Sequence, residues 1–223
     1  MAPVVAACVG ISMAAALGYL AAVGRPDSLW RSALKTLAVL PLAAVSWSVG
    51  APPLLVIALG LGALGDWFLS RPGARAFQLG AASFALGHLA YAALFLTHDA
   101  SDPARLWAAP QVALAPLVVL FGLAMGWLFW RRAGAERVVA LGYIPFILAM
   151  AVAALAVPPL GVFAWLPVAV LAFLGSDTLL ALTRFGIVDR SRLTDRAVWV
   201  SYYGAQLGFF AIYAGFGVNW RVA

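Results

Sequence analysis

The sequence has little charge. Only 10% of its 223 residues are Asp, Glu, Lys or Arg, while 65% are hydrophobic. Soluble domains carry about 25% charged residues, so an ordinary globular domain is excluded. The net charge of +6 does not indicate a nucleic-acid-binding protein, because the arginines lie in short loops between apolar runs and not on a face with stacking aromatics. The composition is that of an integral membrane protein.

Cysteine and histidine are scarce as well. Cys8 is the only cysteine, which excludes an internal disulfide and a cysteine-based metal cluster. With His88 and His98 as the only histidines, a His-rich zinc site is implausible. The chain also has no HExxH, Gly-x-Ser-x-Gly or phosphate-loop motif. The sequence therefore predicts no metal and no cofactor.

The apolar residues form long runs separated by short polar loops. A helix needs about 20 residues to cross a ~30 Å hydrocarbon core, and only helices or closed barrels satisfy their backbone groups in lipid. The pattern predicts an all-α bundle of eight transmembrane helices in a single domain over residues 1–223. The expected spans are residues 3–23, 34–49, 53–70, 76–97, 110–130, 138–157, 162–183 and 197–218. The second is short and contains Pro41, so its start could reach back toward Trp30.

The basic residues are distributed unevenly. Twelve of the fourteen Lys and Arg fall in the loops after the first, third, fifth and seventh spans, and only Arg105 and Arg221 fall on the opposite side. Cytoplasmic loops carry the excess of Lys and Arg. We therefore expect a multi-pass protein of a bacterial inner membrane, with the Arg-rich loops in the cytoplasm and both termini outside.

A faint internal repeat links the two halves of the chain. Leu64-Gly65-Asp66 in the third span is echoed by Leu174-Gly175-Ser176-Asp177 in the seventh, and Gly87-His88-Leu89 by Ala205-Gln206-Leu207. Two parallel four-helix halves would explain this. Chance similarity between spans rich in Leu, Gly and Ala explains it equally well.

Two acids lie inside apolar runs, and the other six lie in loops. An ionised Asp in a span costs roughly 2.5–3.5 kcal/mol, so Asp66 and Asp177 need partners. They stand five residues before Arg71 and seven before Arg184, which puts both ~7–11 Å inward on helices of the same direction. Two acids at one depth can share a cavity, one as acid and one as base. The alternative is structural: both acids hydrogen bond to the backbone or to Lys35.

Further polar residues accompany the acids. His88 and Tyr91 share one helix face, where the histidine serves equally well as an interhelix strut or as a site residue. Tyr202, Tyr203 and Gln206 form a polar patch on the last span. Tyrosines often decorate the membrane interface, but an amide in lipid needs a partner. These residues are therefore candidates for the walls of the same cavity.

Four segments carry a resemblance. They are Gly62–Asp66, Phe84–Tyr91, Ser176–Ala181 with Arg184-Phe185 following, and Tyr202–Gln206. In order and spacing they look like the signature segments of the YhhN/lysoplasmalogenase family of multispanning membrane proteins, over nearly the whole chain. The family tends to have Lys-Pro at the start of its second span, where this chain has Lys35-Thr36.

The resemblance implies an activity. Characterised members cleave the vinyl ether of lysoplasmalogens, giving a fatty aldehyde and glycerophosphocholine or glycerophosphoethanolamine. This reaction needs a neutral carboxylic acid and a carboxylate, and no metal or redox cofactor. The catalytic candidates are Asp66 and Asp177, in roles that the sequence does not assign. The candidates for binding the lysophospholipid substrate are Lys35, His88, Tyr91, Ser176, Arg184, Tyr202, Tyr203 and Gln206, with Lys35 or Arg184 on the phosphate.

Two other classes of function fit the same acids. In a proton-coupled transporter or channel, intramembrane acids relay protons. In a structural membrane protein, they serve only packing. The acids cluster toward one side, and the first, fifth and sixth spans are nearly free of polar groups. This favours a one-sided pocket over a pathway through the membrane, while headgroup preference and oligomeric state stay open.

Overall fold

A computed structural model describes residues 2–215. These residues form eight α-helices and three 3-10 segments, with no strand among them. The α-helices are α1 (Ala2–Ala22), α2 (Leu29–Ser48), α3 (Pro53–Leu69), α4 (Ala74–Thr97), α5 (Gln111–Arg132), α6 (Arg137–Ala154), α7 (Leu166–Arg184) and α8 (Arg192–Ala214). The 3-10 segments are η1 (Pro103–Trp107), η2 (Gly134–Glu136) and η3 (Gly161–Trp165).

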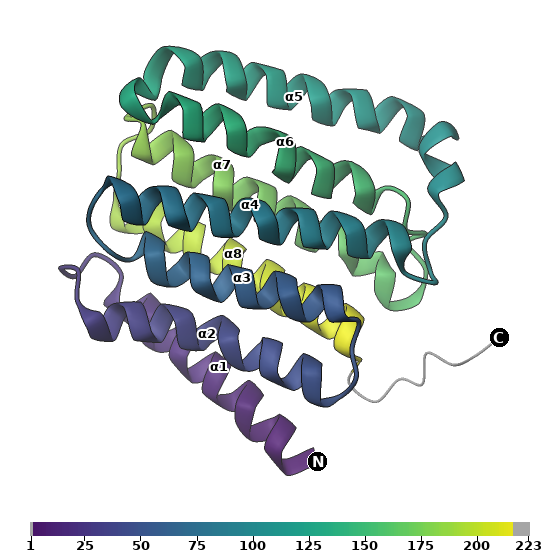
Figure 1. Ribbon diagram of the computed structural model, residues 1–223, viewed down its shortest axis with the longest axis horizontal. Coiled ribbons are helices and arrows are strands. Elements are labelled where there is room, and N and C mark those ends of the chain that lie inside the picture. Colours follow the sequence, from purple (N-terminus) through teal and green to yellow (C-terminus); the bar gives the residue numbers. More distant parts are fainter. Residues whose placement is uncertain (1, 216–223) are drawn as a thin grey trace.

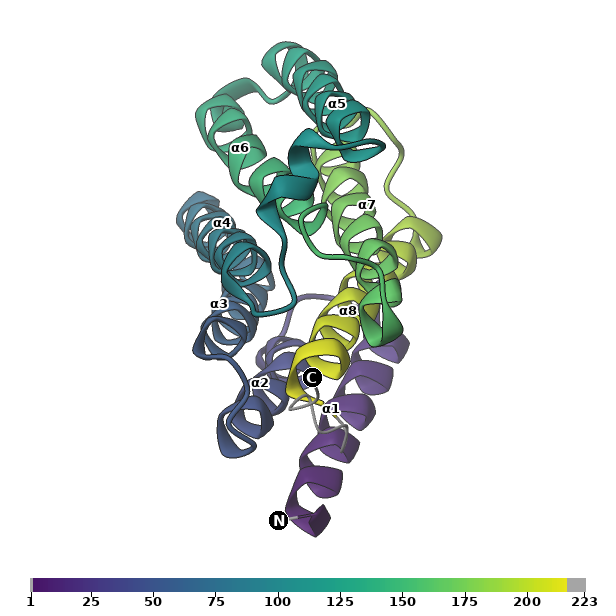
Figure 2. The same cartoon turned by 90° about the vertical axis from the view of Figure 1, so that its right-hand side faces the viewer.

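The helices run up and down the long axis of one bundle (Figure 1). The connections α1–α2, α3–α4, α5–α6 and α7–α8 all lie at the same end, at the left of Figure 1. We call it the basic end, because these connections and the helix turns beside them hold most of the Lys and Arg. Seen along the helices in Figure 2, α8 packs against α1, α2, α3 and α7, whereas α5 lies at the edge and packs mainly against α6.

Five helical segments are long and apolar enough to cross a membrane. They are Pro3–Ala22, Ala74–Thr97, Gln111–Arg132, Gly134–Ala154 and Gly161–Arg184. Helix α3 is apolar but has only 17 residues. Helices α2 and α8 are less apolar because they carry more polar and charged residues, among them Lys35, Arg192 and Gln206. The all-helical membrane class is thus supported, and the crossing of the bilayer by all eight helices stays a prediction.

The helix neighbours correspond between the two halves of the chain. Helix α1 packs on α2 as α5 packs on α6, α2 on α3 as α6 on α7, and α3 on α4 as α7 on α8. Between the halves, α2 contacts α8 and α6 contacts α4. Shifting the labels by four therefore relates these pairs to one another, whereas the contacts of α8 with α1 and α3 have no counterpart of similar extent among the described residues. Two four-helix repeats would produce this pattern, although the repeat itself stays a prediction.

Two helices begin earlier along the chain than the apolar pattern predicts. Helix α2 begins at Leu29, five residues before the start at 34, in agreement with the alternative that it reaches back toward Trp30, so its first turns include charged residues. Helix α8 begins at Arg192, five residues before the expected start at 197, because Ser191 and Thr194 form a capping box. Helix α8 ends at Ala214, and the predicted end at 218 lies outside the described residues.

Aromatic side chains fill the bundle beyond its middle, on the side away from the basic end. Phe173 stacks on Phe209 with ring centroids 6.2 Å apart, and Phe209 packs at 5.6 Å from Phe95. Phe95 in turn stacks on Tyr213 at 5.8 Å. All four side chains are buried. These rings give the interior on this side of the bundle a mainly apolar surface, whereas Asp66 and Asp177 lie nearer the basic end.

Candidate active site

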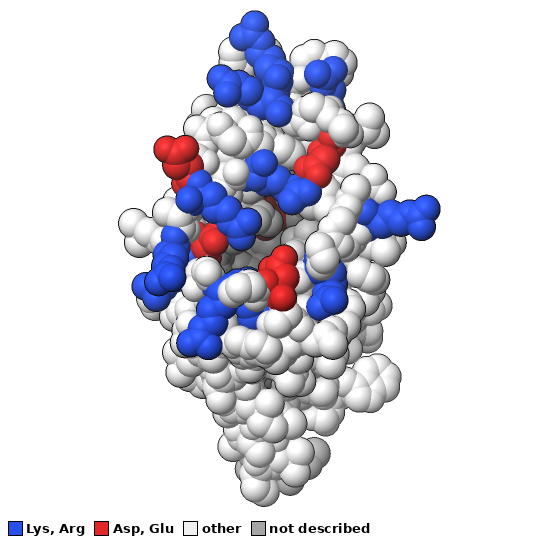
Figure 3. Space-filling model, turned by 90° about the vertical axis from the view of Figure 1, so that its left-hand side faces the viewer, with Lys and Arg blue, Asp and Glu red and all other residues white. Residues whose placement is uncertain are grey.

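A cavity of about 480 Å³ opens at the basic end. Figure 3 looks onto this end and shows the hollow, ringed by Lys and Arg. Its walls come from α1, α2, α3, α4, α7 and α8 and from connections between them. Asp66 on α3 and Asp177 on α7 both line it, as do Lys35 and Tyr202. The two intramembrane acids therefore share one cavity.

Asp66 is fully buried and has charged and polar partners. The Nζ atom of Lys35 on α2 lies 3.1 Å from Oδ1 and forms an ion pair. The Tyr202 hydroxyl on α8 donates a hydrogen bond of 2.7 Å to Oδ2. Behind it, the Gln206 amide donates to the Tyr202 oxygen at 3.1 Å, and the Tyr91 hydroxyl donates to Gln206 Oε1 at 2.5 Å. Asp66 is thus the last acceptor in a buried series of hydrogen bonds, and the charge of Lys35 balances the charge of its carboxylate.

Asp177 has only uncharged hydroxyl and imidazole partners. The Tyr143 hydroxyl on α6 donates a short hydrogen bond to Oδ2. His88 Nε2 on α4 lies 2.6 Å from the Tyr143 oxygen and 3.1 Å from Asp177 Oδ2. The Asp177 side chain is 14% exposed, and among the described residues its Oδ1 has no hydrogen-bond partner. Oδ1 is therefore the oxygen available to a ligand in the cavity.

The two acids occupy corresponding positions in the two halves. Each contacts the preceding helix of its own half and one helix of the other half: Asp66 contacts α2 and α8, and Asp177 contacts α6 and α4. What differs is the chemistry of the partners, a lysine for Asp66 and a histidine-tyrosine pair for Asp177. Equivalent carboxyl groups in unlike surroundings are the arrangement that separates an acid from a base.

The two acids differ in the charge of their partners. Asp66 with Lys35 is neutral when both are ionised. The cluster of Asp177, Tyr143 and His88 contains no such cation, so it is neutral only when it holds one additional proton. Burying a net charge in lipid is costly, and the neutral cluster avoids that cost.

The hydrogen bonds indicate where that proton lies. The Tyr143 hydroxyl donates to Asp177, so His88 Nε2 must donate to the Tyr143 oxygen. His88 Nδ1 is buried without a hydrogen-bond partner in the described part of the chain, which disfavours a proton there. Asp177 Oδ1 is then the carboxyl oxygen of this cluster that has no hydrogen-bond partner among the described residues and can carry a proton.

The remaining predicted residues lie in several places. Ser176 lines the cavity, and its hydroxyl donates to the Val198 carbonyl at 2.9 Å, joining α7 to α8. Arg184 lines the cavity wall but pairs with Glu136 and lies over the Phe77 ring.

Tyr203 lies away from the cavity, with its hydroxyl 2.9 Å from Ser12 Oγ between α1 and α8. His88, Tyr91 and Gln206 stand behind the wall as buried partners.

Tyr143 is the site residue that sequence reasoning did not single out. It is the only tyrosine in the sixth apolar run, from residue 138 to 157. A single tyrosine in such a run is commonly lipid-facing or interfacial, so it gave no reason to expect a partner. Only a comparison of the two halves of the chain could have indicated Tyr143. If Lys35 of the second span contacts Asp66 of the third, a residue of the sixth span is expected to contact Asp177 of the seventh.

A second, apolar pocket of about 100 Å³ adjoins the cavity. Its walls come mainly from α4, α5, α6 and α7, and they include Phe121, Ile144 and Phe129. Asp177 lines both this pocket and the polar cavity. A ligand with a polar head and an apolar tail would place its junction at Asp177, with the tail among these helices.

The bundle and its site define a helical membrane protein with two carboxyl groups in a one-sided, amphipathic cavity. The chain belongs to the YhhN family: the family's sequence model matches residues 30–212, which cover α3 to α7 and nearly all of α2 and α8. No curated protein and no solved structure shows significant similarity to the chain. The match covers both acids and all of their partners described above.

Proposed function

We propose that this protein is a lysoplasmalogenase-like hydrolase that cleaves the vinyl ether of a single-chain ether phospholipid to a fatty aldehyde and a glycerophospho-alcohol. The observation that carries the proposal is the placement of Asp177 where a polar cavity meets an apolar pocket. In such a lipid the vinyl ether lies at the same junction, between headgroup and chain. Membership of the family supports a hydrolase of this kind.

The reaction uses the two carboxyl groups in different roles. Asp177 donates its proton to the β-carbon of the vinyl ether; the π electrons form the new C–H bond and leave an oxocarbenium ion. Asp66, held ionised by Lys35, stabilises this cation electrostatically. Water adds to the cationic carbon and returns a proton to the Asp177 carboxylate. The hemiacetal hydroxyl then loses its proton as the C–O bond to glycerol breaks, and the leaving glycerol oxygen takes up a proton, which gives the aldehyde and the free glycerol hydroxyl.

The orientation of the protein follows the same proposal. We take the basic end, where the cavity opens, to face the cytoplasm of a bacterium, with both termini on the outer side of the inner membrane. The excess of Lys and Arg in these four connections and the helix turns beside them supports this orientation. Transport through the bundle is less well supported, because the buried aromatic cluster around Phe173 and Phe209 fills the path beyond the acids.

A substrate panel tests the bond specificity. The purified protein in detergent is incubated with lysoplasmenyl lipid, an ester-linked lysolipid and a saturated ether lysolipid of the same chain length and headgroup. We expect aldehyde from the first alone, because only a vinyl ether gives an oxocarbenium ion on protonation. Release of fatty acid from the ester, or no product from any of the three, would overturn the proposed reaction.

Tyr143→Phe tests the positioning of the acid. The change removes the hydroxyl that links His88 to Asp177 while keeping the ring. We expect kcat to fall about 10–100-fold, the value of a hydrogen bond to an ionisable group, with KM nearly unchanged. Tyr203→Phe is the matched control, since that hydroxyl bonds Ser12 away from the cavity. Equal losses in the two variants, or a change confined to KM, would contradict this role.

A further inference from the structure

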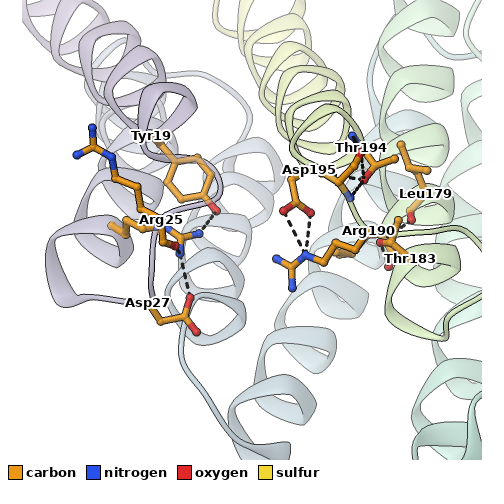
Figure 4. A network of polar contacts seen from close by, with 11 residues as sticks. Tyr19, Arg25, Asp27, Leu179, Thr183, Arg190, Thr194 and Asp195 are labelled. Carbon is orange, nitrogen blue, oxygen red and sulfur yellow. Dashed lines mark hydrogen bonds and ion pairs between the residues drawn. The ribbon is translucent and has the colours of Figure 1, made fainter.

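The cations that line the cavity differ in whether an acid neutralises them. Four of the five have a carboxylate partner. Arg31 lies 3.0 Å from Asp27, Arg190 lies 3.0 Å from Asp195, Lys35 pairs with Asp66, and Arg184 forms a two-pronged pair with Glu136. Figure 4 shows Arg190 against Asp195 in one group of residues, and Tyr19, Arg25 and Asp27 in a second group.

Arg71 is the exception. It lines the cavity from the connection between α3 and α4 and is half-buried. Among the described residues, its only side-chain hydrogen bond is from Nη1 to Ser32 Oγ, at the long distance of 3.5 Å. A guanidinium has five N–H donors, so most of those of Arg71 are free for a ligand. A half-buried cation without a counter-charge on a cavity wall is suited to an anionic ligand.

Its location matches one part of the proposed substrate. Arg71 follows Asp66 by five residues, where the chain leaves α3 at the basic end. It therefore lies nearer the mouth than the acids do. In a lysophospholipid whose vinyl ether is at Asp177, the glycerol extends toward the mouth and carries the phosphate there. Arginine binds phosphate oxygens in pairs, through two parallel N–H groups.

We propose that Arg71 binds the phosphate of the lipid headgroup and so selects single-chain lipids that carry a phosphodiester. This inference rests on the proposed function and changes one part of the sequence-based expectation. The phosphate was expected at Lys35 or Arg184, and the structure gives both of these a carboxylate partner. Arg71 meets the phosphate without breaking an existing ion pair.

Binding of uncleavable lipids tests this directly. The full-length protein in detergent is titrated with a saturated 1-alkyl-glycerophosphocholine, with the matching 1-alkylglycerol that lacks the phosphate, and with inorganic phosphate. The variants are Arg71→Gln, Arg71→Lys and the control Arg75→Gln. Arg75 lies four residues further along, is exposed and is not part of the cavity wall. Neither ether lipid can be hydrolysed, so binding is measured without turnover.

We expect Arg71→Gln to weaken binding of the alkyl phospholipid about 10–100-fold and to leave alkylglycerol binding unchanged. Arg71→Lys, which keeps the charge but not the two-pronged geometry, should fall between Arg71→Gln and the wild type, and Arg75→Gln should match the wild type. Unchanged alkylglycerol binding also shows that each variant is folded. Equal weakening of both lipids by Arg71→Gln, or of neither, would overturn the inference. Inorganic phosphate that binds as tightly as the lipid would assign Arg71 to free phosphate instead.

The outcome is separable from that of the proposed reaction. If the wild type releases no aldehyde yet binds phospholipid through Arg71, the reaction is wrong and the phosphate site stands. If aldehyde is released while Arg71→Gln binds both lipids normally, the reaction stands and the phosphate site is wrong.

Discussion

Asp177→Asn is expected to lower kcat for aldehyde release about 10²–10⁴-fold, the range that a positioned general acid contributes. The amide keeps the shape of the side chain and can still accept the hydrogen bond from Tyr143. It holds no proton acidic enough to give to carbon. The loss should therefore appear in kcat, with little effect on KM or on the elution of the protein from a size-exclusion column.

Two controls make this result specific. Asp102→Asn removes an acid from the opposite end of the bundle, where Asp102 caps η1 through the Ala104 amide and Asn can do the same. It should leave kcat unchanged. Binding of the uncleavable alkyl phospholipid should be the same in Asp177→Asn and in the wild type. A variant that keeps more than about a tenth of wild-type kcat would remove Asp177 from the role of proton donor.

Much of the fold can be predicted from apolar runs, and the failures have a common cause. Lys35 seemed to mark the edge of the second span, but it lies inside α2 and its side chain is directed at Asp66. The start of α8 was missed for a related reason, because Arg192 and Asp195 look like loop residues although they form its first turn. A charged residue lowers the mean hydropathy of a segment equally whether it faces lipid or a polar cavity, so helix ends of this kind are not predicted.

The site, like the fold, could be predicted only in part. Depth counting from Arg71 and Arg184 was enough to expect Asp66 and Asp177 in one cavity, and the structure lines one cavity with both. Their partners could not be ranked, because a sequence gives depth along a helix and not the direction in which a residue faces. Lys35 had two candidate roles, as a partner of an acid or of the phosphate, and only the packing of α2 on α3 selects the pairing with Asp66. Tyr143 required the packing of α6 between α4 and α7.

The ion pair between Lys35 and Asp66 leads to the second large effect. Lys35→Met leaves a fully buried carboxylate with only the Tyr202 hydroxyl as partner, and we expect it to destabilise the protein by about 3–5 kcal/mol. Asp66→Asn should cost less, because the Lys35 side chain is 14% exposed and can extend toward the mouth of the cavity. Thermal unfolding in detergent, followed by circular dichroism, measures both.

The double variant Lys35→Met/Asp66→Asn separates stability from catalysis. Removing both charges leaves no unpaired ion, so the double variant should be clearly more stable than Lys35→Met alone. It should nevertheless stay inactive, because no carboxylate then stabilises the oxocarbenium ion. If aldehyde release recovers together with stability, Asp66 serves only packing and Asp177 acts alone. If the double variant is stable and inactive, the reaction needs the Asp66 carboxylate. Lys35 then serves to keep that carboxylate ionised inside the bundle.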